Sequence, residues 1–326
     1  MIILGVESSC DETGIGILAD GKILCNVVST QEDIHSPYGG IVPELASRAH
    51  IEQIDGLFKQ AIKIAGIKVS DINFIGIANR PGLKGSLLVG ASFASGLAYS
   101  LGKPLYKVNH IHSHISVNFL SPEAEFPALG FVISGGHTTF FYVKDSVSFE
   151  MIGKTLDDAC GETFDKVARM LGLGFPGGPY IEKMAEKGDE KKIKFPASYL
   201  GRDSLDFSFS GLKTAVLYYI KKNGLQAVPD ICASFQKTVG DILTEKTSRC
   251  LDRYSVKSIL LGGGVVQNRY IKRRFLELSQ KKGIKLSLPD KQFCLDNGAM
   301  VAIMTSFLVE QGIPPAPYDI QVIPTV

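Results

Sequence analysis

Two groups of short apolar segments, each joined by tight polar turns, constrain the fold of this chain most strongly. The first group occupies residues 2–28, and a comparable group of three segments recurs at residues 128–153. Short segments spaced in this way are typical of antiparallel strands in a meander. Each group is followed by further apolar and amphipathic stretches, which predict alternating strands and helices. The pattern therefore predicts an α/β protein with a structurally duplicated fold, whose two lobes pack around a cleft.

Longer segments add a coarse assignment of secondary structure. Residues 43–65 have the apolar spacing of one amphipathic helix, and residues 86–102 form the most apolar long stretch. The glycines and serines of that stretch favour a buried packing helix over a membrane span. The remaining assignments are helices at residues 231–252, 265–282 and 296–311, and strands at residues 73–79, 258–264 and 285–289.

Composition and the missing motifs exclude several classes of function. The net charge of +2 provides no large basic field, so nucleic acid would have to bind through a local patch. The six cysteines are scattered without a Cys-x-x-Cys pair, which favours a reducing cytoplasm over disulfides or a thiolate zinc site. No signal peptide is expected, because the start of the chain lacks a basic region. The chain contains no Walker motif, and prolines disrupt the glycine pattern of a dinucleotide site at residues 172–179.

Three of the six histidines lie within residues 110–114. His110 and His114 are four residues apart, so a helix would place both imidazoles on one face. Imidazole is the commonest side-chain metal ligand, and the pair therefore indicates a metal site whose third ligand the spacing does not name. Residue 111 is isoleucine, so the glutamate that a metalloprotease needs beside its first histidine is missing. The alternative is a helix start that carries ordinary polar histidines.

Four polar turns follow predicted strands or open helices, and glycine lets backbone N–H groups in such turns approach phosphate. They occupy residues 7–13, 134–139, 262–268 and 294–300. In a duplicated α/β chain, two hairpin turns and a strand-to-helix turn suit an actin-like ATPase fold. Asp11 and Glu12 lie in the first of these turns, which would face the substrate in such a fold. Their carboxylates are therefore candidates to position or deprotonate a reacting group.

Ten longer motifs carry a resemblance that extends over essentially the whole chain. They are ESSCDETG (7–14), GGIVPELASRAH (39–50), RPGLKGSLLVG (80–90), GKPLYKVNHIHSHI (102–115), VISGGHT (132–138), GETFDKVARMLGLGFPGGP (161–179), FSFSGLKT (207–214), ASFQ (233–236), GGGVVQNRYIKRR (262–274) and DNGAM (296–300). In these motifs and their order, the chain resembles the tRNA N6-adenosine threonylcarbamoyltransferase family, also called TsaD or Gcp and formerly O-sialoglycoprotein endopeptidase.

The resemblance implies an actin-like ATPase (ASKHA) fold, with two RNase H-like lobes around a nucleotide cleft. The first lobe would comprise residues 1–121 plus about 300–326, and the second lobe residues 122–299. One divalent metal ion, Fe²⁺ or Zn²⁺, would be bound by His110, His114 and Asp296. The residues implied to bind substrate or nucleotide are Val132, Ile133, Ser134, Gly135, Gly136, Asp165, Gly178 and Asn268. Asp11 and Glu12 stay the candidates for the catalytic carboxylates.

The activity implied by the resemblance is transfer of a threonylcarbamoyl group from threonylcarbamoyl-AMP to N6 of adenosine 37 in tRNAs that read ANN codons, with release of AMP. The implied enzyme is a cytoplasmic, metal-dependent acyltransferase that does not act at a membrane. Its implied partners are the tRNA anticodon loop, an inactive actin-like paralogue (TsaB) and a P-loop ATPase (TsaE). Candidates to contact the tRNA backbone are Lys272, Arg273, Arg274, Lys281 and Lys282.

Two other classes of function fit parts of the sequence. One is an actin-like ATPase or small-molecule kinase, which the phosphate-binding turns permit but which does not need the His110–His114 pair. The other is a non-catalytic binding role inside a complex, which would leave the predicted metal and carboxylate groups without a purpose.

Overall fold

A computed structural model describes residues 1–201 and 203–324 and divides the chain into two compact units. Unit 1 comprises Met1–Leu120 together with Leu295–Val326, and unit 2 comprises Ser121–Cys294. Because the division falls before Leu295, Asp296 belongs to the same unit as His110 and His114. The predicted cleft between the lobes stays a prediction.

Unit 1 is built on a five-stranded sheet with the order β3-β2-β1-β4-β5. Its strands are β1 (Ile2–Glu7), β2 (Glu12–Ala19), β3 (Lys22–Thr30), β4 (Phe74–Arg80) and β5 (Leu105–Asn109). The first three form the predicted antiparallel meander, whereas β4 and β5 run parallel to β1. The carboxyl ends of β1, β4 and β5 therefore lie at the same edge of the sheet.

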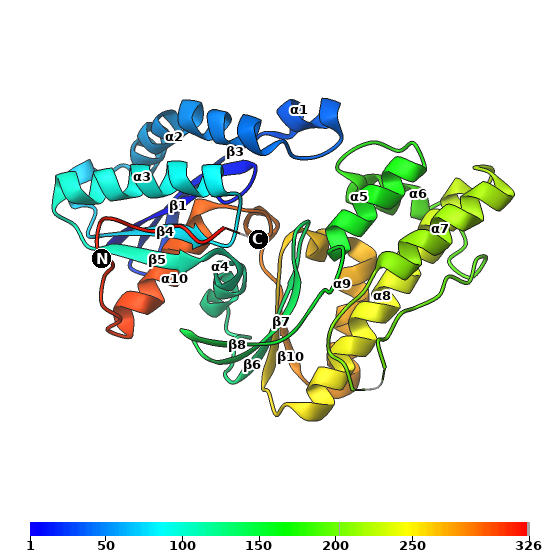
Figure 1. Cartoon of the computed structure of the whole chain (residues 1–326). Helices are drawn as coiled ribbons and strands as arrows, with labels where there is room; N and C mark the ends of the chain where they lie inside the picture. Colours follow the sequence, from blue (N-terminus) through cyan, green and yellow to red (C-terminus); the bar gives the residue numbers. More distant parts are fainter. Residues whose placement is uncertain (202, 325–326) are drawn as a thin grey trace. The chain divides into compact units, whose positions relative to one another are not determined.

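Helices cover both faces of this sheet (Figure 1). α2 (Pro43–Ala65) and α3 (Lys84–Leu101) pack against each other and against one face, and α10 (Gly298–Glu310) packs against the other. Leu4 and Val6 of β1 belong to the apolar core beneath α2 and α3. Because side chains alternate along a strand, Gly5 and Glu7 of β1 point to the opposite face, which α10 covers. The shorter helices are α1 (Glu32–His35), η1 (Ser36–Tyr38), η2 (Val69–Asp71), α4 (His110–Ser116) and η3 (Val117–Leu120).

Helix α10 lies directly on the backbone of the sheet. A Cβ atom added to Gly5 would come within 2.2 Å of the carbonyl oxygen of Gly298, and one added to Gly16 within 2.2 Å of the Ala299 nitrogen. Glycine at these positions therefore permits the close approach. This packing fixes the start of α10, and with it Asp296, relative to β1 and β2.

Unit 2 repeats the same strand arrangement, with the order β8-β7-β6-β9-β10. Its strands are β6 (Ala128–Ile133), β7 (Thr138–Asp145), β8 (Ser148–Lys154), β9 (Ser258–Gly262) and β10 (Lys285–Ser287). Here too the first three strands are antiparallel, and the last two run parallel to the first. The duplication that the sequence pattern predicted is thus confirmed by identical topology.

The helices of unit 2 gather on one side of its sheet (Figure 1). They are α5 (Cys160–Met170), α6 (Gly177–Ala185), α7 (Ser210–Asn223), α8 (Val228–Arg253) and α9 (Arg269–Lys282), with the short η4 (Gly264–Gln267) and η5 (Lys291–Phe293). Aromatic rings fill the core between sheet and helices, where Phe131 contacts Phe140 at a centroid distance of 4.1 Å and stacks on Phe207 at 5.4 Å. Within the described residues, no helix combines the length and apolar character needed to cross a membrane.

Candidate metal and nucleotide sites

The candidate metal site lies at the carboxyl edge of the unit 1 sheet. β5 ends at Asn109, and α4 begins at His110, the next residue. The Asn109 side chain caps this helix by accepting hydrogen bonds from the N–H groups of Ile111 (2.8 Å) and His112 (3.4 Å). The cap starts the helix at His110, so His110 and His114 lie one turn apart. Asp296 approaches the same edge because it immediately precedes the start of α10.

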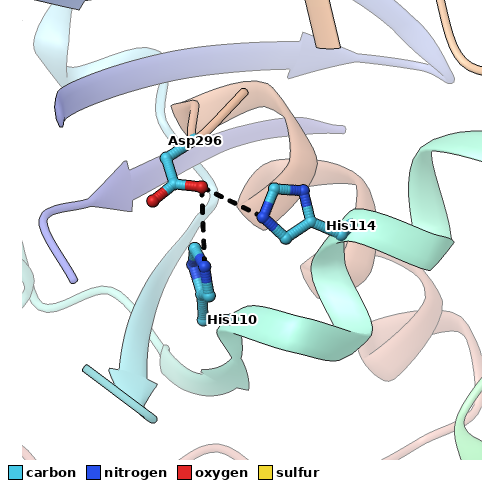
Figure 2. Close-up of side chains that lie close together, drawn as sticks. All are labelled: His110, His114 and Asp296. Carbon is cyan, nitrogen blue, oxygen red and sulfur yellow. Dashed lines mark hydrogen bonds and ion pairs between the residues drawn. The ribbon is translucent and has the colours of Figure 1, made fainter. Parts of the chain in front are cut away.

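His110, His114 and Asp296 converge there (Figure 2), the three residues that the family resemblance implied. Oδ1 of Asp296 lies 3.0 Å from Nε2 of His114 and 3.5 Å from Nε2 of His110. The two imidazole rings meet edge to face, with centroids 4.8 Å apart. Exposed fractions of the side chains are 6% for His110, 1% for His114 and 18% for Asp296. Two imidazoles and one carboxylate thus face a common point in a largely buried setting.

This geometry fits a divalent metal ion. Ligand atoms about 2.1 Å from one ion, at angles between octahedral and tetrahedral, are separated by about 3.0–3.4 Å. The 3.0 Å and 3.5 Å separations around Asp296 have this size, and the three possible ligand atoms lie within 4.8 Å of one another. Two histidines with one carboxylate is a donor set for zinc or for non-haem iron, and it leaves coordination positions open. The residues present therefore fit the predicted cofactor.

The Nδ1 atom of His110 contacts two residues that were not among the predicted site residues. Its Nδ1 lies 2.9 Å from Oε2 of Glu7 and 3.0 Å from Oγ of Ser9. Burial by itself lowers the pKa of His110, but the charges of Asp296 and Glu7 outweigh burial and raise this pKa to about 9. The sequence feature that could have identified Glu7 is its position in β1, where it shares a face with Ile3 and Gly5. An acid in phase with buried residues is unusual unless it has a partner.

Asp11 ends the turn between β1 and β2, and Glu12 is the first residue of β2, so both lie at the same edge of unit 1, where they are half-buried. Burial raises the pKa of Glu12 well above its usual range, and the charges of Asp296 and Asp11 raise it further. The neighbouring Asp11 side chain adds to this rise. The raised pKa favours the neutral form of the Glu12 carboxyl group.

Two neighbours of these carboxyl groups bear on the chemistry of the turn. Burial and the charge of Asp11 raise the pKa of the Cys10 thiol well above its usual value, so Cys10 is a poor nucleophile. His50 of α2 supports the turn at both ends, through a 3.0 Å contact of Nε2 with the Cys10 carbonyl and a 2.7 Å contact of Nδ1 with the Thr13 hydroxyl. The sequence analysis did not single out His50.

In unit 2, the turn of Ser134, Gly135 and Gly136 follows β6 at the carboxyl edge of that sheet. The start of α5 packs on it, since the Gly161 and Glu162 N–H groups donate to the carbonyls of Ser134 (3.1 Å) and Gly135 (3.2 Å). Both turn glycines are exposed, and no atom lies within 4 Å of the position that a Cβ on either one would take. The turn can therefore admit a ligand against its backbone.

The other predicted nucleotide residues lie on neighbouring elements of unit 2. Oδ1 of Asp165, on α5, accepts a hydrogen bond of 2.7 Å from the N–H of Gly177, which opens α6 and precedes Gly178. Asn268 caps α9 by accepting from Ile271 N–H at 3.0 Å, and its Nδ2 donates to Gln236 at 2.8 Å. Asp165 and Asn268 thus also stabilise the local structure, a role that was not predicted from the sequence.

Two groups of predicted binding residues are placed less favourably for ligands. Val132 and Ile133 are fully buried within β6, so of the five residues predicted to bind in this motif only Ser134, Gly135 and Gly136 reach the surface. On α9, Arg274 pairs with Asp241 at 2.6 Å, and Lys282 pairs with Asp252 at 2.7 Å. The basic charge predicted to meet tRNA is thus partly neutralised within unit 2.

Comparison with known proteins identifies the family. Residues 22–303 match the sequence profile of TsaD, tRNA N6-adenosine threonylcarbamoyltransferase. Proteins of that name from Thermosipho africanus and Geotalea uraniireducens are 50% and 43% identical to this chain, over 96% and 99% of its length and 96% of theirs. The chain belongs to the tRNA N6-adenosine threonylcarbamoyltransferase family. The predicted function is therefore confirmed at the level of the family's named activity, and the ATPase or kinase alternative is not favoured.

Solved structures support the fold independently. The crystal structure of full-length HypF in its phosphate- and nucleotide-bound form superposes with a TM-score of 0.65 at 17% identity, covering 95% of this chain, which spans 56% of that protein. Component A of the (R)-2-hydroxyglutaryl-CoA dehydratase of Acidaminococcus fermentans gives 0.55 at 16% identity, covering 94% and 97% of the two chains. At these identities the likeness establishes the fold, and the predicted ASKHA class is confirmed.

Proposed function

We propose that this family member transfers the threonylcarbamoyl group of threonylcarbamoyl-AMP to N6 of adenosine 37 in tRNAs that read ANN codons. A bond forms between N6 and the carbamoyl carbon, the anhydride bond from that carbon to the phosphate oxygen breaks, and AMP and one N6 proton leave. The donor is already activated, whereas the amine is a poor nucleophile because its lone pair is delocalised. Positioning and charge stabilisation therefore supply most of the rate. The supporting observation is identity of 43–50% to named members over nearly the whole chain.

His110, His114 and Asp296 would hold one Fe²⁺ or Zn²⁺ ion, which supplies Lewis-acid stabilisation of anionic oxygen when it is bound. The protein's own contribution is the fixed spacing of these ligands. α4 holds the two imidazoles one turn apart, and the packing of α10 on Gly5 and Gly16 holds the carboxylate opposite them. This proposal is supported by the 3.0 Å and 3.5 Å ligand separations.

Asp11 is proposed to orient the amine and to accept its proton. Its side chain is half-buried beside Glu12, whose raised pKa keeps that partner neutral. A neutral Glu12 donates a hydrogen bond to Asp11, which fixes the direction of the Asp11 carboxylate without adding a second negative charge. The target base must leave the stack of the anticodon loop to reach such a group.

The adenylate is proposed to bind unit 2 through Ser134–Gly136, Asp165, Gly178 and Asn268. Support comes from the open space beside Gly135 and Gly136 and from the nucleotide-bound form of HypF, which shares the fold. Because the Gly161 and Glu162 N–H groups already donate to the turn carbonyls, the phosphate would be met by the N–H groups of the turn itself.

We also propose that the chain acts in the cytoplasm as part of an assembly. The expected partners are an inactive actin-like paralogue and a P-loop ATPase, and the tRNA anticodon loop is the macromolecular substrate. These proposals follow from the family resemblance.

A transfer assay tests the function. The chain is mixed with these partners, threonylcarbamoyl-AMP and an unmodified tRNA transcript that reads an ANN codon, and the digested nucleosides are analysed by mass spectrometry. We expect threonylcarbamoyladenosine and AMP in equal amounts. A matched transcript with guanosine at position 37 lacks the acceptor amine and should give neither. Loss of the donor without modified nucleoside, in the complete mixture, would contradict the proposal.

A further inference from the structure

Glu7 is a fully buried carboxylate at the end of β1. Its Oε1 accepts a hydrogen bond of 2.6 Å from the N–H of Ser9, and its Oε2 lies 2.9 Å from Nδ1 of His110. The residue therefore joins two parts of the unit 1 site: the turn that carries Asp11 and Glu12, and the imidazole that faces Asp296.

The contact with Glu7 sets which nitrogen of His110 carries a proton. A carboxylate at Glu7 can only accept hydrogen bonds, and with that partner Nδ1 is the donor to Oε2. In the neutral ring this leaves the lone pair on Nε2, the nitrogen that points towards Asp296. Ser9 Oγ, at 3.0 Å from the same Nδ1, can accept or donate and sets no tautomer by itself.

The weak compensation of a buried charge on Glu7 indicates that this side chain has a function. Burying an ion costs on the order of several kcal/mol unless a partner compensates it. Among the ion pairs of the described residues, Glu7 takes part in one, with His110, and neither lysine nor arginine compensates it. A hydrocarbon side chain would serve the sheet at lower cost, so the carboxylate is explained by what it does to His110.

We propose that Glu7 is a positioning residue for the metal site, which orients the His110 ring and holds it in the tautomer that presents Nε2 to the ion. The inference rests on the proposed metal-binding function of His110, His114 and Asp296. Carboxylate partners of this kind fix metal-ligating imidazoles, and their loss typically lowers metal affinity about 10–100-fold.

The variant Glu7→Gln tests this without any measurement of activity. Glutamine has one acceptor oxygen for the two donors that Glu7 satisfies, and its NH₂ group can donate to Nδ1 and favour the opposite tautomer. The affinity of purified full-length chain for Zn²⁺ alone is measured by competition with a chelator. We expect Glu7→Gln to bind about 10–100-fold more weakly than wild type, and the matched variant Ser9→Ala, which removes the other contact of Nδ1, to stay within a few-fold. Wild-type affinity in Glu7→Gln would overturn the inference.

A second measurement keeps the inference testable if Glu7→Gln does not fold. In wild-type protein labelled with ¹⁵N-histidine and loaded with Zn²⁺, nuclear magnetic resonance should show a proton on Nδ1 of His110 and the metal on Nε2. Metal on Nδ1 would refute the role of Glu7. The Zn²⁺ titration distinguishes failure of the metal site from failure of the role of Glu7. If the wild-type protein does not bind Zn²⁺ stoichiometrically, the proposed metal function is wrong. If wild type and Glu7→Gln bind Zn²⁺ equally well, only the proposed role of Glu7 is wrong.

Discussion

Two adjacent carboxyl groups, Asp11 and Glu12, lie where the first hairpin turn meets β2. Burial and the charges of Asp296 and Asp11 raise the pKa of Glu12 well above its usual range, which favours its neutral form. A neutral acid donates a hydrogen bond, whereas a carboxylate accepts a proton from a substrate. In the proposed mechanism the pair divides into a proton acceptor, Asp11, and a neutral partner that orients it.

Isosteric amides should separate these roles. Asp11→Asn removes the proton acceptor, and we expect transfer to fall by roughly 10²–10⁴-fold, the usual range for a general acid–base group. Glu12→Gln replaces a neutral acid by a neutral amide that still donates to Asp11, so transfer at neutral pH should stay within a few-fold of wild type. Initial rates at saturating donor and tRNA, with metal content as the control, measure both. Equal losses in the two variants would contradict the division.

At the residue scale, the convergence of the proposed metal ligands could be predicted, in part from residue spacing and in part from the family resemblance, whereas the residues that support them could not. The i,i+4 spacing identified His110 and His114 as a pair, but Asp296 is 182 positions beyond His114, and only the family resemblance named it. Glu7 and His50 belong to no local pattern of ligands. Glu7 is 103 positions from His110 and meets it because β1 and β5 end at one edge of a sheet. Sequence spacing carries no information about such a contact until the strand order is known.

At the scale of elements, the packing of α10 on the unit 1 sheet determines where Asp296 lies. The helix contacts strand backbone at Gly5, Gly14 and Gly16, where a Cβ would approach backbone atoms of residues 297–302 to between 2.2 and 2.6 Å. Backbone atoms cannot rotate away as a flexible side chain can. A methyl group at this interface must therefore move the helix, and with it Asp296, the proposed metal ligand near its start.

Gly16→Ala should accordingly reduce both stability and metal affinity. Overpacking of a well-packed interface typically costs about 1–3 kcal/mol, and we expect the upper part of this range. The matched control is Gly56→Ala in α2, where no atom lies within 4 Å of the added Cβ. There alanine should stabilise the helix by about 0.5–1 kcal/mol. Thermal unfolding and Zn²⁺ titration measure the two effects, and unchanged values for Gly16→Ala would show that α10 is not held by this contact.

The strands and the longest helices were predictable, whereas three helices of unit 2 were not. The predicted helix at residues 43–65 coincides with α2, and the helix predicted at 231–252 extends to Val228–Arg253 as α8. Helices α5, α6 and α7 were not predicted. α5 and α6 have 11 and 9 residues and flank a segment rich in glycine and proline, so their apolar periodicity is too short to stand out. Their packing on the aromatic core of unit 2 supplies the stability that local sequence lacks.

At the scale of the whole molecule, the duplicated topology provides two equivalent sheet edges with different chemistry. In unit 1, the turn after the first strand carries Asp11 and Glu12, and the edge also receives two histidines and Asp296. In unit 2, the corresponding turn after β6 carries Gly135 and Gly136, with open space beside them. One edge thus concentrates negative charge and imidazole, which suit a cation, and the other exposes backbone N–H groups, which suit an anion. In the proposed function, the duplicated fold would bind two ligands because the side chains at the two edges differ.

This division predicts that two ligands protect different parts of the chain from hydrogen exchange. Zn²⁺ should slow exchange at residues 7–13, 110–116 and 294–300 of unit 1, and ADP at residues 134–138, 160–165 and 263–268 of unit 2. Ligand at about 100 times its Kd stabilises the binding state by about 2.7 kcal/mol, which slows exchange through local opening about 100-fold. His114→Ala should abolish the first pattern and keep the second, because the His114 ring is proposed to bind metal in unit 1 and takes no part in the proposed nucleotide site of unit 2. The assignment would be refuted if Zn²⁺ slowed hydrogen exchange in unit 2 but not in unit 1, and if this protection persisted in His114→Ala. Such a result would place the metal in unit 2.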